Sequence, residues 1–139
     1  CRPEQIKRYQ EKLSGPLLDR IDLHVTVPAL PVSDLQSTQA GESSASVRAR
    51  VIAAFNRQQV RQGKANNELS PNELQQHAPL GEAQAKILAL AQQRLNLSAR
   101  GYHRVLRVAR TIADLADSET IDTPHLTEAL SYRSQLVNG

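Results

Sequence analysis

Aromatic residues are scarce in this sequence of 139 residues: they make up 3% of it, as one phenylalanine and three tyrosines, and neither tryptophan nor methionine occurs. Proteins that bind single strands by stacking bases on aromatic side chains need more such rings, so the composition disfavours that class. Hydrophobic residues make up 40% and charged residues 22%, which is ordinary globular usage and excludes a disordered or collagen-like chain. Leucine, alanine and valine are left to fill the core, and this favours helices.

Cysteine occurs once, at Cys1, so the sequence forms no internal disulfide. No stretch approaches the roughly 18 apolar residues of a membrane span. The first four residues, Cys1-Arg2-Pro3-Glu4, lack the apolar run of a signal peptide. We therefore expect a soluble, cytoplasmic protein without membrane contacts. The missing initiator methionine predicts that the sequence is part of a longer protein.

The common catalytic and metal-binding motifs are missing as well. The phosphate-binding pattern G-x-x-x-x-G-K-[ST] is absent, because Gly63-Lys64-Ala65 has neither the first glycine nor the hydroxyl residue. The four histidines show no metal-ligand spacing, and no G-x-S-x-G run indicates a serine hydrolase. We expect that this chain alone hydrolyses no ATP and binds neither cofactor nor metal.

The pattern of the sequence predicts a mainly α fold, a helical bundle preceded by one strand and a linker. The alternation in Leu23-His24-Val25-Thr26-Val27 favours the strand. A stretch rich in serine, glutamine and threonine, 31–46, is typical of a flexible linker. Helices are predicted from Pro3 to a stop at Ser14-Gly15-Pro16, from about 47 to Gly63, from Ser70 to about His77, from about 83 to 95, from Ser98 to about Ala116, and from Thr123 onward.

Apolar spacing predicts which faces of these helices are buried. The helix after Ser98 has one broad apolar arc, and the helices before and after it have narrower stripes. The arc consists of Tyr102, Val105, Leu106, Ala109, Ile112, Ala113 and Ala116. The stripes consist of Ala83, Ile87, Leu90, Ala91 and Leu95 in the preceding helix, and of Leu126, Leu130 and Val137 in the following one.

Four arginines fall opposite the apolar arc of the helix after Ser98: Arg100, Arg104, Arg107 and Arg110. One interpretation is a solvated helix side whose charge is relieved by Asp114 and Asp117. The other is contact with an anion, since the planar fork of arginine suits phosphate oxygens. Arg100 lies in the first turn, where free amides and the helix dipole favour a phosphate. The formal net charge of +3 permits nucleic acid as a partner without requiring it.

Arg20 is the second candidate for phosphate contact. It follows the Gly15-Pro16 bend and precedes the predicted strand, so backbone on both sides restricts its position. A local ion pair with Asp19 or Asp22 is one interpretation. A rigidly presented arginine is also what an arginine finger needs, because it must meet the charge that develops on a transferring phosphoryl group.

Two blocks of the sequence carry a resemblance to a known family. The first is Arg8-Tyr9 followed by Ser14-Gly15-Pro16-Leu17-Leu18-Asp19-Arg20-Ile21-Asp22-Leu23, and the second runs from Leu97 to Leu115. Together they closely resemble the C-terminal part of the magnesium-chelatase-like AAA+ ATPases of the ComM/YifB type. The first block is similar to the arginine-finger segment of MCM helicases and magnesium chelatase. Ser98-Ala99-Arg100-Gly101 is similar to the start of the chelatase sensor-2 helix.

The resemblance implies a division of the chain and roles for its arginines. Residues 1–30 would end the AAA+ α/β core with its last helix and strand, 31–46 would be the linker, and 47–139 the helical lid. Arg20 matches the finger that reaches the γ-phosphate of ATP on the neighbouring subunit, and Arg100 matches the sensor-2 arginine. Whether Arg100 acts within its own subunit or across the interface stays open. Arg104, Arg107 and Arg110 would contact DNA, line the interface or pair with acidic groups outside this chain.

The function implied by the resemblance is that of an ATP-driven motor. The complete protein would use ATP and Mg²⁺ in a hexameric ring and migrate DNA branches during natural transformation and recombination, while this fragment alone would be a monomer. A helical DNA-binding module that uses the arginine face is one alternative. A magnesium-chelatase subunit of pigment synthesis is another.

Overall fold

The structure, a computed structural model, describes residues 2–12 and 15–134. Within these ranges all regular secondary structure is helical, which confirms the predicted mainly α fold. The helices are α1 (Pro3–Glu11), α2 (Gly15–Asp19), α3 (Val32–Leu35), α4 (Ser44–Gln62), the 3₁₀ helix η1 (Asn66–Glu68), α5 (Pro71–His77), α6 (Glu82–Leu95), α7 (Ala99–Leu115) and α8 (Thr123–Ser134). None of these helices combines the length and apolar character that a membrane crossing demands.

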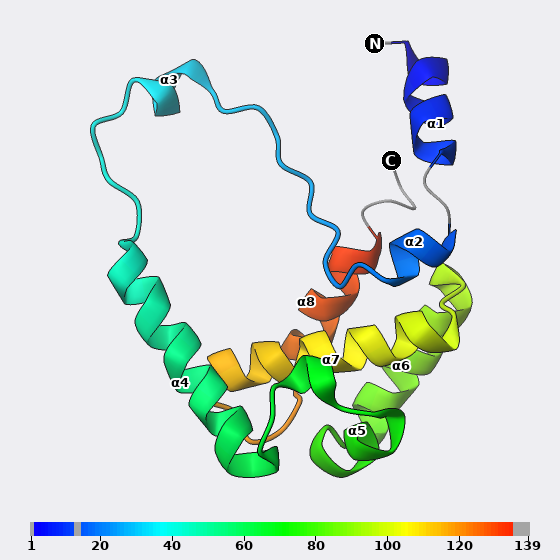
Figure 1. Ribbon diagram of the computed structural model, residues 1–139. Helices are drawn as coiled ribbons and strands as arrows, with labels where there is room; N and C mark the ends of the chain where they lie inside the picture. The colour runs from blue at the N-terminus through cyan, green and yellow to red at the C-terminus, as the bar shows by residue number, and fades with distance from the viewer. Residues whose placement is uncertain (1, 13–14, 135–139) are drawn as a thin grey trace.

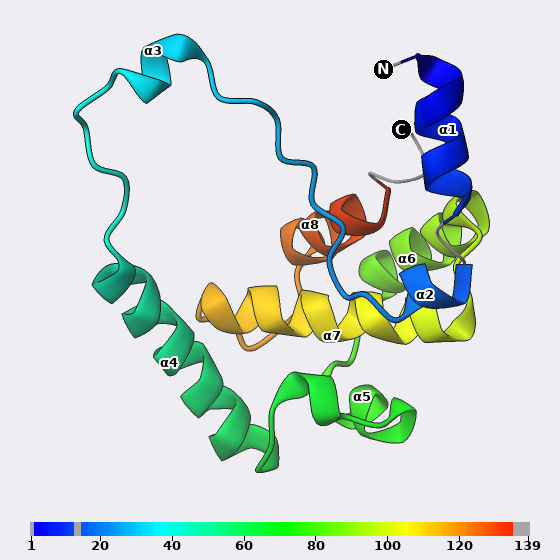
Figure 2. The ribbon, with the colours of Figure 1, turned by 45° about the horizontal axis from the view of Figure 1, so that its top comes forward.

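Helix α7 is the central element of the bundle. It contacts α4, α5, α8, η1 and α2, and Figures 1 and 2 show α4 crossing near its C-terminal end and α2 beside its N-terminal end. The predicted apolar arc of α7 is confirmed at its centre, where Val105, Leu106, Ala109 and Ala113 are buried. Their small and branched side chains pack with leucines from the other elements: Leu69, Leu74, Leu88 and Leu126.

The predicted stripe of α6 is confirmed in part, since Ile87 packs against the core and Ala91 and Leu95 are half-buried. Leu88, which lies outside that stripe, is fully buried, whereas Leu90 within it is 49% exposed. Helix α6 is apolar around much of its circumference, and it packs against α8. Burial in such a helix is decided by its neighbours, which the spacing of apolar residues does not reveal. In α8, Leu126 is buried as predicted, while Val137 lies outside the described residues.

The predicted strand at 23–27 does not form. These residues lie in an irregular segment, and the described ranges of the chain contain no strand that could pair with them. A strand is stabilised by its neighbour, so alternation of residue types is insufficient here. The N–H of His24 instead donates to the carbonyl oxygen of Tyr132 in α8 at 3.0 Å.

The N-terminal region otherwise follows the prediction in part. Helix α1 begins at Pro3, as predicted, and the predicted stop at Ser14 lies outside the described residues. Gly15 and Pro16, predicted as a bend, are the first two residues of the five-residue helix α2. The segment 31–43 is exposed and irregular except for α3, and Figure 1 shows it looping away from the bundle. Its flexibility stays a prediction.

Local capping signals are confirmed. Gly63 ends α4 with a φ of 74°, a left-handed conformation that glycine adopts without steric cost. At the start of α5 the Ser70 hydroxyl accepts from the N–H of Glu73 at 3.3 Å, and the Glu73 carboxylate accepts from the N–H of Ser70 at 3.2 Å. Lys64 pairs with this carboxylate, and together with Ser70 it lowers the pKa of Glu73 to about 2.

Substitution of Ser70 by alanine tests the energetic weight of this cap. We expect the free energy of unfolding to fall by about 1 kcal/mol, because the N–H of Glu73 loses its side-chain acceptor. Urea denaturation measures the change. Ser44→Ala is the matched control, since its hydroxyl makes no hydrogen bond with a described residue. Equal stability of the two variants would contradict the capping role.

Candidate functional site

Arg20 lies in the turn that follows α2, and its side chain is exposed. Its backbone N–H donates to the carbonyl oxygen of Leu17 at 3.1 Å, which fixes the turn. Its guanidinium makes no hydrogen bond or ion pair with any residue that the structure describes. The predicted alternative of a local ion pair is not formed, because Asp19 accepts from Ser98 and Asp22 pairs with Arg104.

Arg100 occupies the first turn of α7 and is also exposed. The hydroxyl of Ser98 caps this helix by accepting from the N–H of Gly101 at 3.0 Å, as the sequence predicts. Arg100 forms no hydrogen bond or ion pair with another described side chain. A free guanidinium beside the positive end of a 17-residue helix is suited to an anionic ligand.

A hydrogen bond joins the segments that carry these two arginines. The Ser98 hydroxyl donates to Asp19 Oδ2 at 2.8 Å, although the two residues are 79 positions apart. Asp19 directly precedes Arg20, and Ser98 comes two residues before Arg100. Figure 2 shows α2 lying against this end of α7. We call this region, residues 18–24 together with 98–104, the arginine corner; it brings together two candidates that the sequence suggested independently.

Arg104 and Arg107 are engaged within the chain. Arg104 pairs with Asp22, and its side chain is 23% exposed. Arg107 donates through Nε and Nη2 to the carbonyl oxygen of Leu69, at 3.1 and 2.9 Å. Burial, together with the charge of Arg104, lowers the pKa of Arg107. These side chains therefore connect α7 to the turn after α2 and to the segment before α5.

Arg110 corrects the prediction that four arginines share one accessible face. It is 2% exposed, and it donates to Asp114 at 3.2 Å and to the carbonyl oxygens of Ser118 and Glu119 at 2.7 and 2.9 Å. The loop after α7 folds back over this side of the helix and supplies the two carbonyls. The acidic partner of Arg110 thus lies within this chain, and Arg110 is not available to DNA or to another subunit here.

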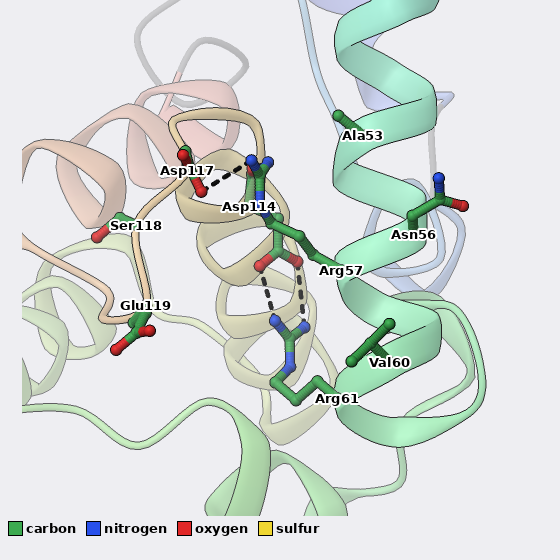
Figure 3. A pocket seen from close by; sticks show the side chains of 9 residues that line it. All are labelled: Ala53, Asn56, Arg57, Val60, Arg61, Asp114, Asp117, Ser118 and Glu119. Carbon is green, nitrogen blue, oxygen red and sulfur yellow. Dashed lines mark hydrogen bonds and ion pairs between the residues drawn. The ribbon is translucent and has the colours of Figure 1, made fainter.

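Asp114 is fully buried, and its pairing with Arg110 confirms the predicted relief of arginine charge by this carboxylate. Its partners Arg61 and Asn66 were not predicted. Arg61 from α4 donates to its carboxylate at 2.7 and 3.1 Å (Figure 3). Asn66 donates to the same carboxylate at 2.9 Å. Burial alone raises the pKa of Asp114, but Arg61, Asn66 and Arg110 outweigh it and lower the pKa below its ordinary value. The spacing of Arg110 and Asp114, four residues apart in a helix, was the available signal.

A hollow of about 630 Å³ lies beside this cluster, between α4 and the loop after α7. Figure 3 shows Arg57 and Arg61 reaching across it from α4. Both are paired, Arg61 with Asp114 and Arg57 with Asp117 at 2.8 Å. Since both of these arginines already bind carboxylates, they join α4 to the C-terminal end of α7 and the loop after it. The arginine corner is therefore the better candidate for binding an anion.

The arrangement limits the chemistry of the site. Within residues 2–12 and 15–134, no three histidine, cysteine or carboxylate side chains gather in a way that could hold a metal ion. The exposed guanidinium groups of Arg20 and Arg100 are the groups of the corner that can contact the phosphates of a nucleotide. Their guanidinium groups can stabilise negative charge on phosphate oxygens.

Comparison with known proteins finds family matches over both segments that form the corner. The family "Magnesium chelatase, subunit ChlI C-terminal" matches residues 41–133, and "Magnesium chelatase, subunit ChlI" matches residues 1–35. The chain is 47% identical to Competence protein ComM of Haemophilus influenzae over 135 residues, which cover 96% of the chain and 26% of that protein. It is also 47% identical to the uncharacterized protein YifB of Escherichia coli over 135 residues, 96% of the chain and 27% of YifB.

A more distant relative is an uncharacterized protein of Mycobacterium tuberculosis, 37% identical over 137 residues, or 96% of the chain and 27% of that protein. The chain thus spans about a quarter of the length of these relatives. The resemblance to the ComM/YifB type is confirmed. Because the match to the family "Magnesium chelatase, subunit ChlI C-terminal" covers more than half of its residues, the chain belongs to that family, and with it to the AAA+ proteins.

Proposed function

We propose that this chain supplies two phosphate-contacting arginines, Arg20 and Arg100, to the ATP sites of a ring-shaped AAA+ motor. The observation that carries the proposal is the hydrogen bond between Ser98 and Asp19, which holds two exposed arginines without described partners at one corner. Surface arginines commonly pair with nearby carboxylates. Here both flanking carboxylates of Arg20 are committed to α7, so its guanidinium stays available.

Arg20 acts as the arginine finger and Arg100 as the sensor-2 arginine in this proposal. When bound elsewhere in the complete protein, ATP with Mg²⁺ supplies the phosphoryl group that is transferred to water. The two guanidinium groups bind its oxygens and offset the charge that grows during transfer. Both arginines lie at the arginine corner, and we therefore assign them to the same nucleotide, which is bound by the neighbouring subunit. Arg100 then acts across the subunit interface together with Arg20.

The work that this hydrolysis drives is DNA branch migration by a cytoplasmic hexamer in natural transformation. The name of the Haemophilus relative, Competence protein ComM, supports this choice. The DNA-binding module that uses the arginine face of α7 loses its main support, because Arg110 is buried and Arg107 is bound to Leu69. A chelatase subunit of pigment synthesis would use the same arginines, and a porphyrin-metallation assay on the complete complex distinguishes it.

Arg100→Ala in the complete protein tests the sensor-2 role. We expect kcat for ATP hydrolysis to fall on the order of 10²-fold, the cost of losing one donor to a developing oxyanion. A phosphate-release assay measures kcat, and a fluorescent ATP analogue measures nucleotide binding. Arg48→Ala is the matched control, since Arg48 is exposed on α4, far along the chain from the corner. Turnover of Arg100→Ala equal to that of the control would contradict the role.

Mixed rings test whether Arg100 acts across the interface. Subunits with Arg20→Ala are mixed with subunits with Arg100→Ala, and ATP hydrolysis is compared with that of each variant alone. If both arginines reach the nucleotide of the neighbour, every interface lacks one of them and we expect no recovery. Recovered turnover would show that Arg100 acts within its own subunit, because some interfaces would then be complete.

A further inference from the structure

The turn that carries Arg20 is held by α8. Arg133, which is 6% exposed, donates through Nη1 to the carbonyl oxygen of Leu18 at 2.9 Å and lies with Nη2 at 3.5 Å from that of Asp19. His24 is also buried, and its Nε2 lies 3.1 Å from the same Leu18 oxygen. Its backbone N–H donates to the carbonyl oxygen of Tyr132. Helix α8 therefore contacts the chain on both sides of Arg20.

Helix α7 holds the same turn through side chains. Ser98 binds the carboxylate of Asp19, and Arg104 binds that of Asp22. The residues immediately before and two positions after Arg20 are thus fixed, while the guanidinium of Arg20 has no partner among the described residues. The backbone around Arg20 is therefore held in place while its guanidinium stays available to a ligand, as expected of a side chain whose position is important for binding.

The burial of Arg133 needs an explanation other than stability. Removing a guanidinium from water is costly unless hydrogen bonds or a counter-ion compensate it. Among the described residues no carboxylate lies within ion-pair distance of Arg133, and its Nε is buried without a partner. Burial lowers the pKa of Arg133, which indicates the same cost. What the side chain does provide is two donors directed at the last carbonyls of α2, next to Arg20.

We propose that Arg133 is a positioning residue for Arg20: by binding the carbonyl oxygens of Leu18 and Asp19, it determines where the guanidinium of Arg20 reaches. The inference rests on the proposed function of Arg20 as an arginine finger. Arg133 itself touches no nucleotide. A displacement of about 1 Å in a catalytic group can cost on the order of 10²-fold in rate, so losing the two donors should lower turnover without affecting ATP binding.

Arg133→Met in the complete protein is the test, because methionine fills similar space and donates no hydrogen bond. We expect kcat for ATP hydrolysis to fall on the order of 10²-fold, with the affinity for a fluorescent ATP analogue unchanged. Arg133→Lys keeps a donor and a charge and should recover part of the loss. Arg94→Met, at an exposed site on α6, is the matched control. Unchanged kcat in Arg133→Met would overturn the inference.

A double-mutant cycle separates positioning from a general structural effect. If Arg133 acts through Arg20, then Arg133→Met should lower kcat no further in an Arg20→Ala background, so the two effects are not additive. Additive losses would overturn the inference while leaving the finger assignment intact. If Arg20→Ala alone keeps full activity, the proposed function itself is wrong. Should Arg133→Met fail to fold, the same cycle is run with Arg133→Lys, whose additive loss would equally count against positioning.

Discussion

Replacing Arg20 by alanine in the complete protein is expected to lower kcat for ATP hydrolysis by about 10³ to 10⁵-fold, the range measured for arginine fingers. The physical reason is that the guanidinium of Arg20 stabilises the negative charge that develops on the phosphoryl group in the transition state, so its removal raises the energy of that state most. Binding of ATP in the ground state should change little. Single-turnover hydrolysis and equilibrium binding of a nucleotide analogue measure the two effects separately.

Two further variants sharpen this experiment. Arg20→Lys keeps the charge but not the fork, so we expect most of the loss to remain. Arg48→Ala removes an equally exposed arginine elsewhere and should leave kcat unchanged. The structure predicts little effect of Arg20→Ala on stability, since the side chain has no described partner. A variant that unfolds at the same urea concentration and yet hydrolyses ATP at the normal rate would exclude the finger role.

Replacing Asp114 by alanine should have the largest effect on folding. Its carboxylate joins Arg61 of α4, Asn66 and Arg110 of α7 in a fully buried position. Removing it leaves the guanidinium of Arg110 buried without its counter-ion, and breaking such a pair costs about 3–5 kcal/mol. Urea denaturation measures the loss. Asp117→Asn, which alters the exposed partner of Arg57, is the control and should cost much less.

The same cluster should make stability depend on pH. The pKa of Asp114 is lower in the folded protein than its ordinary value of 3.8. Its contribution to stability is therefore complete above that ordinary value and is lost as the pH falls through the lower pKa of the folded state. The difference in unfolding free energy between the original protein and Asp114→Asn should shrink over that acidic range. A difference that stays constant there would contradict the shift.

Local signals were predictable from the sequence because they depend on residues a few positions apart. The left-handed end of α4 at Gly63 and the caps at Ser70 and Ser98 are such signals. The strand prediction at 23–27 failed because pairing depends on a neighbour that the described chain does not provide. The stripe on α6 was right only in part for a related reason, since the neighbours of this helix decide that Leu88 is buried and Leu90 is exposed.

The candidate site was predictable only as separate residues. The Gly-Pro bend indicated Arg20 and the helix start indicated Arg100, whereas no pattern in the sequence indicated that Asp19 would bind Ser98. The four arginines of α7 also differ in exposure, which the sequence did not predict. Arg100 is exposed and Arg110 is buried, because other segments of the chain cover only Arg110. The spacing of residues within one helix predicts which of them share a face, but the ion pairs between distant segments depend on how the helices pack.

The link between Arg133 and Leu18 spans 115 positions of the chain. During synthesis on the ribosome, the segment around Arg20 is made long before α8 emerges, so it cannot yet adopt its final geometry. A polypeptide that is cut short before α8 would carry the arginine without its fixed orientation. If positioning governs turnover, hydrolysis is possible only in chains whose translation has passed α8.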